Sequence, residues 1–182
     1  ADLPDRRARP AADELTGDAR ARATVSGVVR LQILANSLGV IAVALYFGFL
    51  FPPTAGGSLA PVDLNVEAFA IYLAAMILLA LPLNAMALRR AVSWVRAGTP
   101  PTERQRRLVL RLPLAETASA FLSWIGAAVL FGLINRDVQR TSAGIVLAGV
   151  VTCAFLYLLL EGHFRPLFAL ALADAELPED RR

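Results

Sequence analysis

The sequence predicts an all-α integral membrane protein with four transmembrane helices and both termini in the cytoplasm. Of its 182 residues, 57% are hydrophobic and only 18% are charged, whereas a soluble domain has about 45–50% apolar and about 25% charged residues. The mean hydropathy is +0.56. The apolar residues gather in four blocks, and the charges lie between them. This pattern is typical of a polytopic helical membrane protein.

The distribution of arginine predicts the topology. All 18 basic residues are arginine, and 16 of them fall in the N-terminal segment, the central connector and the C-terminal segment. The two remaining segments between apolar blocks hold only Arg136 and Arg140. Because arginine accumulates on the cytoplasmic side, both termini and the connector are predicted to be cytoplasmic. The arginine-rich composition also suggests a GC-rich bacterial genome, and therefore the bacterial plasma membrane.

The chain divides into a polar cytoplasmic tail (1–26), a four-helix transmembrane domain (27–173) and a short polar tail (174–182). The spans are predicted at about 31–51, 66–88, 113–134 and 143–160. The first has 21 residues, enough to cross about 30 Å of hydrocarbon. Residues 52–65 and 135–142 are expected to be external loops. Residues 167–173 are apolar but too short to span, so we expect an interfacial helical turn there.

The cytoplasmic connector, residues 89–111, carries seven of the arginines. The Ala97–Pro101 stretch is predicted to break any helix continuing from the second span, and Thr102 to start a new one, which Pro113 interrupts or caps. We expect the connector to lie on the membrane surface and contact anionic lipid head groups. The basic isoelectric point does not favour nucleic-acid binding, because no recognised nucleic-acid motif accompanies it. The predicted head-group contacts are Arg89, Arg90, Arg96, Arg104, Arg106, Arg107 and Arg111.

Small residues recur every fourth position in the last two spans, where they let another helix approach closely. Ala128 and Gly132 repeat the pattern on an adjacent face of the third span, and Thr152 extends it in the fourth. The predicted helix-packing residues are Ala115, Ser119, Ser123, Ala127, Gly144 and Ala148.

A few polar residues lie inside the predicted spans. Gln32 and Asn36 share one helix face, which we expect to look into the bundle. Pro82 is predicted to kink the second span, with Asn84 beside it; such a kink can mark a ligand cavity, although structural packing is the commoner role. For Glu116 we favour a position near a helix N-terminus, paired with a nearby arginine. The alternative is a functional acid within the membrane. The candidate intramembrane ligand site is Asn36, Pro82, Asn84 and Glu116.

No phosphate-binding glycine loop, nucleophile elbow, catalytic Cys/His pair or zinc-binding helix is present in the sequence. The single cysteine, Cys153, is expected to be a small packing residue. The single histidine, His163, lies where the fourth span is expected to leave the membrane; a pH-sensing role is conceivable, but such a residue is usually structural. We therefore expect no catalysis, metal or cofactor in this chain.

Two stretches nevertheless resemble a known family. They are TPPTERQRRLVLRLPLAETASAFLSWIGAAVLFGLIN, starting at Thr99, and LYLLLEGHFRPLFALALA, starting at Leu156. They are similar to the membrane region of actinobacterial class III adenylate cyclases of the six-helix type, in which a HAMP linker joins the spans to a cytoplasmic cyclase domain. The resemblance covers about residues 27–173. The residues that carry it are Pro101, Thr102, Arg106, Pro113, Leu114, Trp124, Arg165 and Pro166.

The resemblance implies a membrane anchor and sensor that holds a cytoplasmic, cAMP-producing domain as a homodimer and responds to a membrane or lipid ligand. Two further spans, the linker and the catalytic domain with its metal-binding aspartates are not in this chain. No catalytic residue can therefore be carried over, and Mg or Mn and ATP would belong to the cyclase domain. On this interpretation the chain is the first four spans of a longer protein.

Two alternatives remain open. The chain could be a small four-span accessory or structural subunit of a membrane complex. Less favoured is a small transporter or lipid-binding carrier built around Pro82, Asn84 and Glu116.

Overall fold

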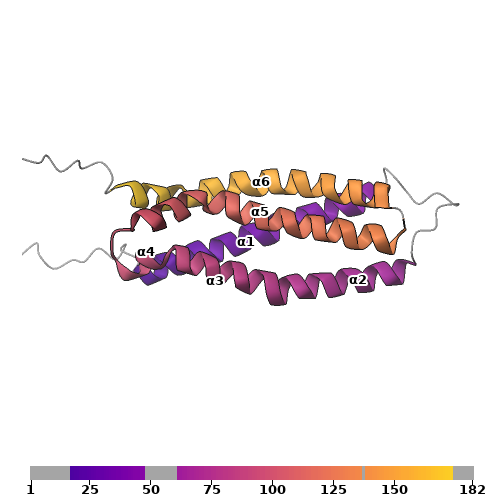
Figure 1. The fold of residues 1–182 in the computed structure, drawn as a ribbon, viewed down its shortest axis with the longest axis horizontal. Coiled ribbons are helices and arrows are strands. Elements are labelled where there is room, and N and C mark those ends of the chain that lie inside the picture. Colours follow the sequence, from indigo (N-terminus) through magenta and orange to yellow (C-terminus); the bar gives the residue numbers. More distant parts are fainter. Residues whose placement is uncertain (1–16, 48–60, 137, 174–182) are drawn as a thin grey trace, which may run out of the picture.

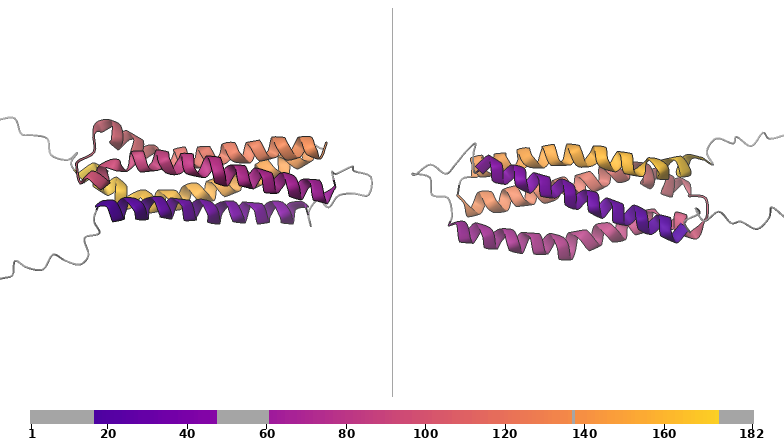
Figure 2. Two further views of the ribbon diagram at one scale, coloured as in Figure 1. Left: turned by 90° about the horizontal axis from the view of Figure 1, so that it is seen from below. Right: turned by 180° about the vertical axis from the view of Figure 1, so that it is seen from behind.

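The computed structural model describes residues 17–47, 61–136 and 138–173, and these residues form helices without any strand. Four helical stretches are long and apolar enough to cross a membrane: Ala19–Leu45, Val62–Ala91, Glu103–Ile134 and Val138–Ala173. The predicted all-α fold with four candidate transmembrane helices is confirmed. The helices lie side by side along one long axis (Figures 1 and 2).

Helix α1 runs from Gly17 to Leu45, over 29 residues. It begins ten residues before the predicted boundary of the transmembrane domain, so residues 17–26 are part of the bundle and not of a polar tail. Ala21 and Val25 are buried in the core, which explains why the helix extends this far. The rest of the predicted tail and most of the predicted loop at 52–65 lie outside the described residues.

The second apolar stretch is one long rod made of three segments. These are α2 (Val62–Ala75), the π-helical turn η2 (Met76–Ala80) and α3 (Leu81–Ala91). In the π-turn the Leu81 N–H donates to the Met76 carbonyl five residues back. Pro82, which has no N–H to donate, follows directly. The predicted irregularity at Pro82 is confirmed, and the rod bends at this turn (Figure 1).

The connector breaks and restarts as predicted. The short helix α4 (Ser93–Ala97) ends at Gly98, whose φ of 62° lies in the left-handed region that favours glycine. Helix α5 (Glu103–Ile134) then begins with a capping box, in which the Thr102 side chain accepts from the Gln105 N–H and the Gln105 side chain accepts from the Thr102 N–H.

The last two helices both continue through a proline. Pro113 lies buried inside the 32-residue α5, so the third span is not a helix starting at Pro113. Likewise α6 (Val138–Ala173) is one helix of 36 residues that continues through Pro166. Residues 167–173, predicted to form a separate helical turn, are therefore the last turns of α6, and the connection at 135–142 is shorter than predicted. The exit from the membrane after residue 160 stays a prediction. Packing outweighs the hydrogen bond that each proline removes, because Leu160, Phe164, Leu167 and Ala171 on α6 are all buried.

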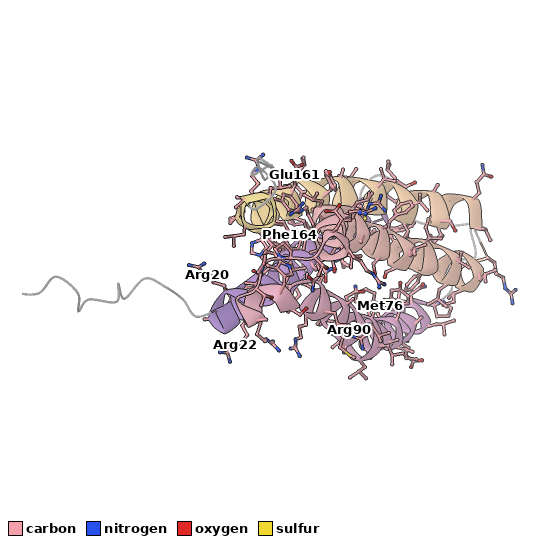
Figure 3. All side chains as sticks on the ribbon, turned by 60° about the vertical axis from the view of Figure 1, so that its left-hand side comes forward. Arg20, Arg22, Met76, Arg90, Glu161 and Phe164 are labelled. Atoms are coloured by element: carbon pink, nitrogen blue, oxygen red, sulfur yellow. The ribbon has the colours of Figure 1, made fainter. Side chains whose placement is uncertain are left out.

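The bundle has two distinct ends. We call the end where α1 and α5 begin and α3 and α6 finish the arginine end, because Arg20, Arg22 and Arg90 project from its surface (Figure 3). The most deeply buried large side chains are concentrated between the middle of the bundle and this end. They are Phe164, Leu88, Leu156, Leu160, Val28, Val92 and Val109. Near this end α1 and α6 are joined by the contact between Thr24 and His163.

Candidate functional site: a polar network inside the bundle

The most unusual feature of the interior is a carboxyl group hydrogen-bonded to an amide between α1 and α5. Gln32 on α1 and Glu116 on α5 are only 8% and 6% exposed. The Gln32 Nε2 donates to the Glu116 Oε2 at 2.7 Å. Because polar groups inside a membrane protein are costly unless they are satisfied, this contact fixes how the two helices face each other.

The same network continues one turn along α1 and two turns along α5. The Asn36 Nδ2 donates to the Gln32 carbonyl at 2.8 Å, and the Trp124 Nε1 donates to the Asn36 Oδ1 at 3.0 Å. Residues 32 and 36 share a face of α1, and residues 116 and 124 share a face of α5. Two side-chain hydrogen bonds, Gln32–Glu116 and Trp124–Asn36, therefore join these helices, and the backbone carbonyl of Gln32 links the two pairs.

Two glycines let α1 and α6 close around the Trp124 ring. A Cβ atom at Gly39 on α1 would collide with the Thr152 hydroxyl and the Trp124 ring. A Cβ at Gly149 on α6 would lie 2.7 Å from the Trp124 Cβ and 2.8 Å from its Cγ. Trp124 is 8% exposed, so its indole is enclosed by helices that approach closely because these positions lack side chains.

A second set of polar contacts joins α5 to the α2–α3 rod. The Asn84 amide and the Ser119 hydroxyl lie 3.2–3.3 Å apart, and the Tyr72 hydroxyl donates to the Ser123 carbonyl. Near the opposite end of the bundle, the Asn65 and Asn135 side-chain amides pair at 2.8–3.0 Å. These hydrogen bonds are only partly buried.

The four residues of the predicted ligand site are thus not one site. Asn36 and Glu116 belong to the same buried network. Asn84 faces Ser119 on another side of α5, and Pro82 is exposed. The predicted pairing of Glu116 with an arginine is wrong: in the described residues its hydrogen-bond partner is Gln32. The reason is that α5 starts at Glu103, so Glu116 lies well inside the helix and out of reach of the helix N-terminus.

The predicted stripes of small residues are placed in different surroundings. Ser119, Ser123 and Ala127 are half-buried on the side of α5 toward the α2–α3 rod, and Ala115 is exposed. The fully buried stripe is its neighbour, with members Glu116, Ala120, Trp124, Ala128 and Gly132. On α6, Gly144 is buried against the Tyr46 ring and Ala148 is half-buried.

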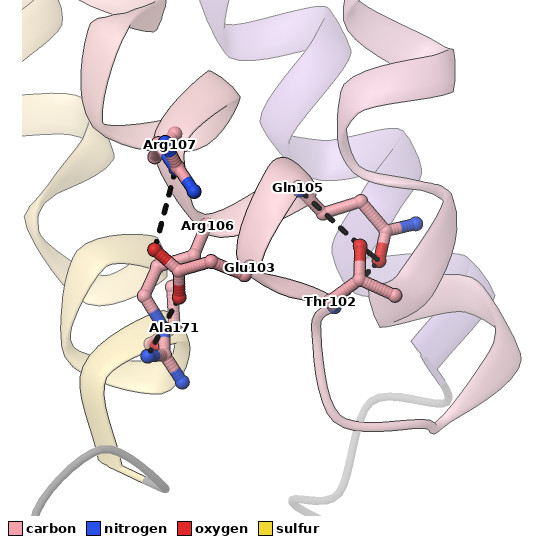
Figure 4. Close-up of polar contacts among 6 residues, drawn as sticks. All are labelled: Thr102, Glu103, Gln105, Arg106, Arg107 and Ala171. Carbon is pink, nitrogen blue, oxygen red and sulfur yellow. Dashed lines mark hydrogen bonds and ion pairs between the residues drawn. The ribbon is translucent and has the colours of Figure 1, made fainter.

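The arginines of the connector do not all face solvent. Six are exposed, but Arg106 turns inward (Figure 4). The Arg106 Nε donates to the Ala171 carbonyl at 3.0 Å, and its guanidinium lies 3.3 Å from the Glu103 carboxylate. Arg106 therefore joins the start of α5 to the last turn of α6. The head-group contacts of the other six, Arg89, Arg90, Arg96, Arg104, Arg107 and Arg111, stay a prediction.

Cys153 and His163, for which the sequence favoured structural roles, also contact other parts of the bundle. Cys153 is buried in the core, as expected for a packing residue. The His163 Nε2 lies 3.2 Å from the Thr24 carbonyl, which ties α6 to α1 near the arginine end. A Cβ at Gly27 would collide with the His163 ring, so glycine at that position makes room for the histidine.

Sequence reasoning missed the partners that complete these networks. The indole N–H of Trp124 was a usable signal, because a buried tryptophan needs an acceptor and Trp124 lies two turns from Glu116. The pairing of Asn65 with Asn135 had no such signal, since 70 positions separate them.

The arrangement offers hydrogen bonds that set helix orientation, and the described residues contain no group of histidine, cysteine and acidic side chains able to hold a metal ion. No family model, no curated protein and no solved structure matches this chain.

Proposed function

We propose that this chain is the membrane domain of a bacterial signalling protein, which anchors, dimerises and regulates a cytoplasmic adenylate cyclase domain in the plasma membrane. The resemblance of residues 27–173 to such membrane regions motivates the proposal. In this arrangement the arginine end faces the cytoplasm, in accord with the positive-inside rule.

The observation that best supports the proposal is the joint between α5 and α6. Two residues of the resemblance build this joint: Thr102 caps α5, and Arg106 holds the last turn of α6 through the Ala171 carbonyl. A segment following α6 would start from this joint. A rotation or shift of α6 in the membrane would therefore reach a cytoplasmic domain directly.

The lengths of the helices fit this role. At 1.5 Å per residue, the 36 residues of α6 extend about 54 Å, well beyond the roughly 30 Å of hydrocarbon. The 29 residues of α1 extend about 44 Å. In the proposed topology both helices extend past the hydrocarbon at the arginine end, where His163 and Thr24 link them.

The first test is the gene sequence beyond the codon for Arg182. The proposal expects two further apolar spans, a HAMP-like linker and a cyclase domain. A reading frame that stops there would contradict it and favour the accessory-subunit alternative. That alternative has one observation of its own: no residue of α2 is buried within the described structure, so its surface is available to lipid or to a partner subunit.

The second test measures cAMP formation by the full-length protein in membranes. Arg106→Ala removes the contact with Ala171, and we expect it to change the rate of cAMP formation several-fold without lowering the amount of membrane-inserted protein. Arg89→Ala, an exposed arginine at the same end, is the matched control and should leave the rate unchanged. Equal rates in both variants and the parent protein would contradict the role of the joint.

A further inference from the structure

We propose that the face of α5 formed by Arg104, Arg107 and Arg111, with Leu108 between them, binds the phosphate head group of an anionic phospholipid. This inference does not depend on the proposed cyclase, because it concerns only the first turns of α5 and the surface that follows them.

The three arginines are gathered by the helix itself. Their spacing of three and four residues puts them on one face of α5. All three are exposed, and Leu108 beside them is 49% exposed. Together the four residues line an open surface groove with a volume of about 340 Å³.

The groove keeps an excess of positive charge. Glu103 pairs with Arg107 at 3.3 Å, but both side chains are largely exposed, at 61% and 70%, and such surface pairs are weak. Among the described residues, no acidic side chain pairs with Arg104 or Arg111. Guanidinium groups suit a phosphate because they can donate two parallel hydrogen bonds to its oxygens.

The surface beyond the groove identifies the ligand as a lipid and not as free phosphate. The same face of α5 continues into the bundle region through small and aliphatic residues that are exposed: Ala115, Ala118, Leu122, Val129 and Leu133. Leu122 is 70% exposed and Leu133 is 65% exposed. A lipid whose phosphate sits on the arginines would lay its acyl chains along this apolar track.

Arg106 gives a contrast within the same turns of helix. It lies on another face, where the Ala171 carbonyl and Glu103 occupy its donors. Figure 4 shows Arg106 directed toward the end of α6, while Arg107 contacts only Glu103 among the residues drawn. The division separates one arginine that joins helices from three that are available to a ligand.

The test is lipid binding to the purified chain in detergent, measured by native mass spectrometry with added phosphatidylglycerol or phosphatidylcholine. The variant R104Q/R107Q/R111Q removes the groove charges. The variant R20Q/R22Q/R165Q removes the same number of exposed arginines from the same end, none of them a predicted head-group contact. It therefore matches any effect of net charge or of altered membrane orientation. Thermal unfolding of both variants verifies that each is folded.

We expect the groove variant to lose at least about tenfold in affinity for phosphatidylglycerol, since each surface arginine contributes on the order of 1 kcal/mol. The control variant should stay close to the parent protein, and phosphatidylcholine should bind weakly to all three. Equal losses in the two variants would mean a diffuse electrostatic effect and would overturn the proposal. Full competition by inorganic phosphate at equal concentration would overturn it too, because the acyl track would then contribute nothing.

Discussion

The unit formed by α1, α5 and α6 buries a larger share of its residues inside the protein than the α2–α3 rod does. In the most apolar part of α6, 39% of the residues are buried inside the protein, whereas in the corresponding part of the rod none is. Glycines and a tryptophan join the helices of the first unit, and partly buried polar contacts attach the rod to α5. The difference indicates that close helix packing specifies the three-helix unit. The rod is held by a few hydrogen bonds and by Leu88 and Ala91, which are buried at the end of α3, while most of its other apolar side chains are exposed.

The largest predicted effect is in the core of the three-helix unit. Phe164 on α6 has no exposed surface, so Phe164→Ala leaves a cavity and should cost about 3–5 kcal/mol of stability. Phe155→Ala on the same helix is the control, because Phe155 is 44% exposed and the change leaves no cavity. Reversible unfolding in mixed micelles measures both, and similar losses would contradict the tight core.

A substitution that adds one carbon tests the close approach of α6 to α5. Gly149→Ala forces a Cβ against the base of the Trp124 side chain, which cannot move without shifting α5. We expect a loss of about 1–3 kcal/mol. Gly162→Ala is the matched control on α6, because a Cβ there meets nothing within 4 Å, and the better helix propensity of alanine should stabilise slightly. A neutral Gly149→Ala would show that these helices are not in close contact.

We expect the polar network to stabilise the protein through the hydrogen bond between Gln32 and Glu116 and not through a charge on Glu116. Glu116→Ala leaves the buried Gln32 amide without its acceptor and should destabilise by about 1–2 kcal/mol. Glu116→Gln keeps an acceptor oxygen of the same reach, so we expect it to retain most of the stability. The same unfolding assay compares them, and equal losses would indicate that the carboxyl group itself is required.

The smallest expected effect concerns the rod. A double-mutant cycle of Asn84→Ala and Ser119→Ala should give a coupling energy of about 0.6 kcal/mol, the mean for hydrogen bonds between transmembrane helices. The matching cycle for Gln32 and Glu116, which are buried, should give a larger value. If the coupling at Asn84 were the larger, the proposed contrast between the two units would be reversed.

Much of the fold could be predicted from the sequence because it depends on composition. Apolar blocks of sufficient length give the four helices, and Gly98 and Thr102 mark the break and restart by local chemistry alone. The ends of helices were harder, because Pro113 and Pro166 are local stop signals that tertiary packing overrides.

The candidate site could be predicted only in part. Gln32 and Asn36 were placed on one inward face because their spacing reports a helix face directly. The sequence did not show which face of α5 Gln32 and Asn36 would contact. Two stripes on α5 have the same spacing of four residues, Ala115–Ser119–Ser123 and Glu116–Ala120–Trp124, and only the second contacts α1. The choice between them depends on how α1 and α6 cross α5, which no local pattern encodes.

The π-helical turn at Met76–Ala80 changes the direction in which side chains of α2 point relative to those of α3. Tyr72 and Asn84 are twelve residues apart, and in an uninterrupted α-helix, at 3.6 residues per turn, they would point in directions about 120° apart. A π-turn accommodates one extra residue, which brings both side chains back onto the face that meets Ser123 and Ser119. Deleting a single residue from this turn would restore a regular α-helix and leave Tyr72 and Asn84 only about 20° apart in direction. Converting the turn to a regular α-helix without removing a residue would instead rotate α2 by about 100° relative to α3, and would aim Tyr72 and Asn65 away from α5 without changing any residue that they touch.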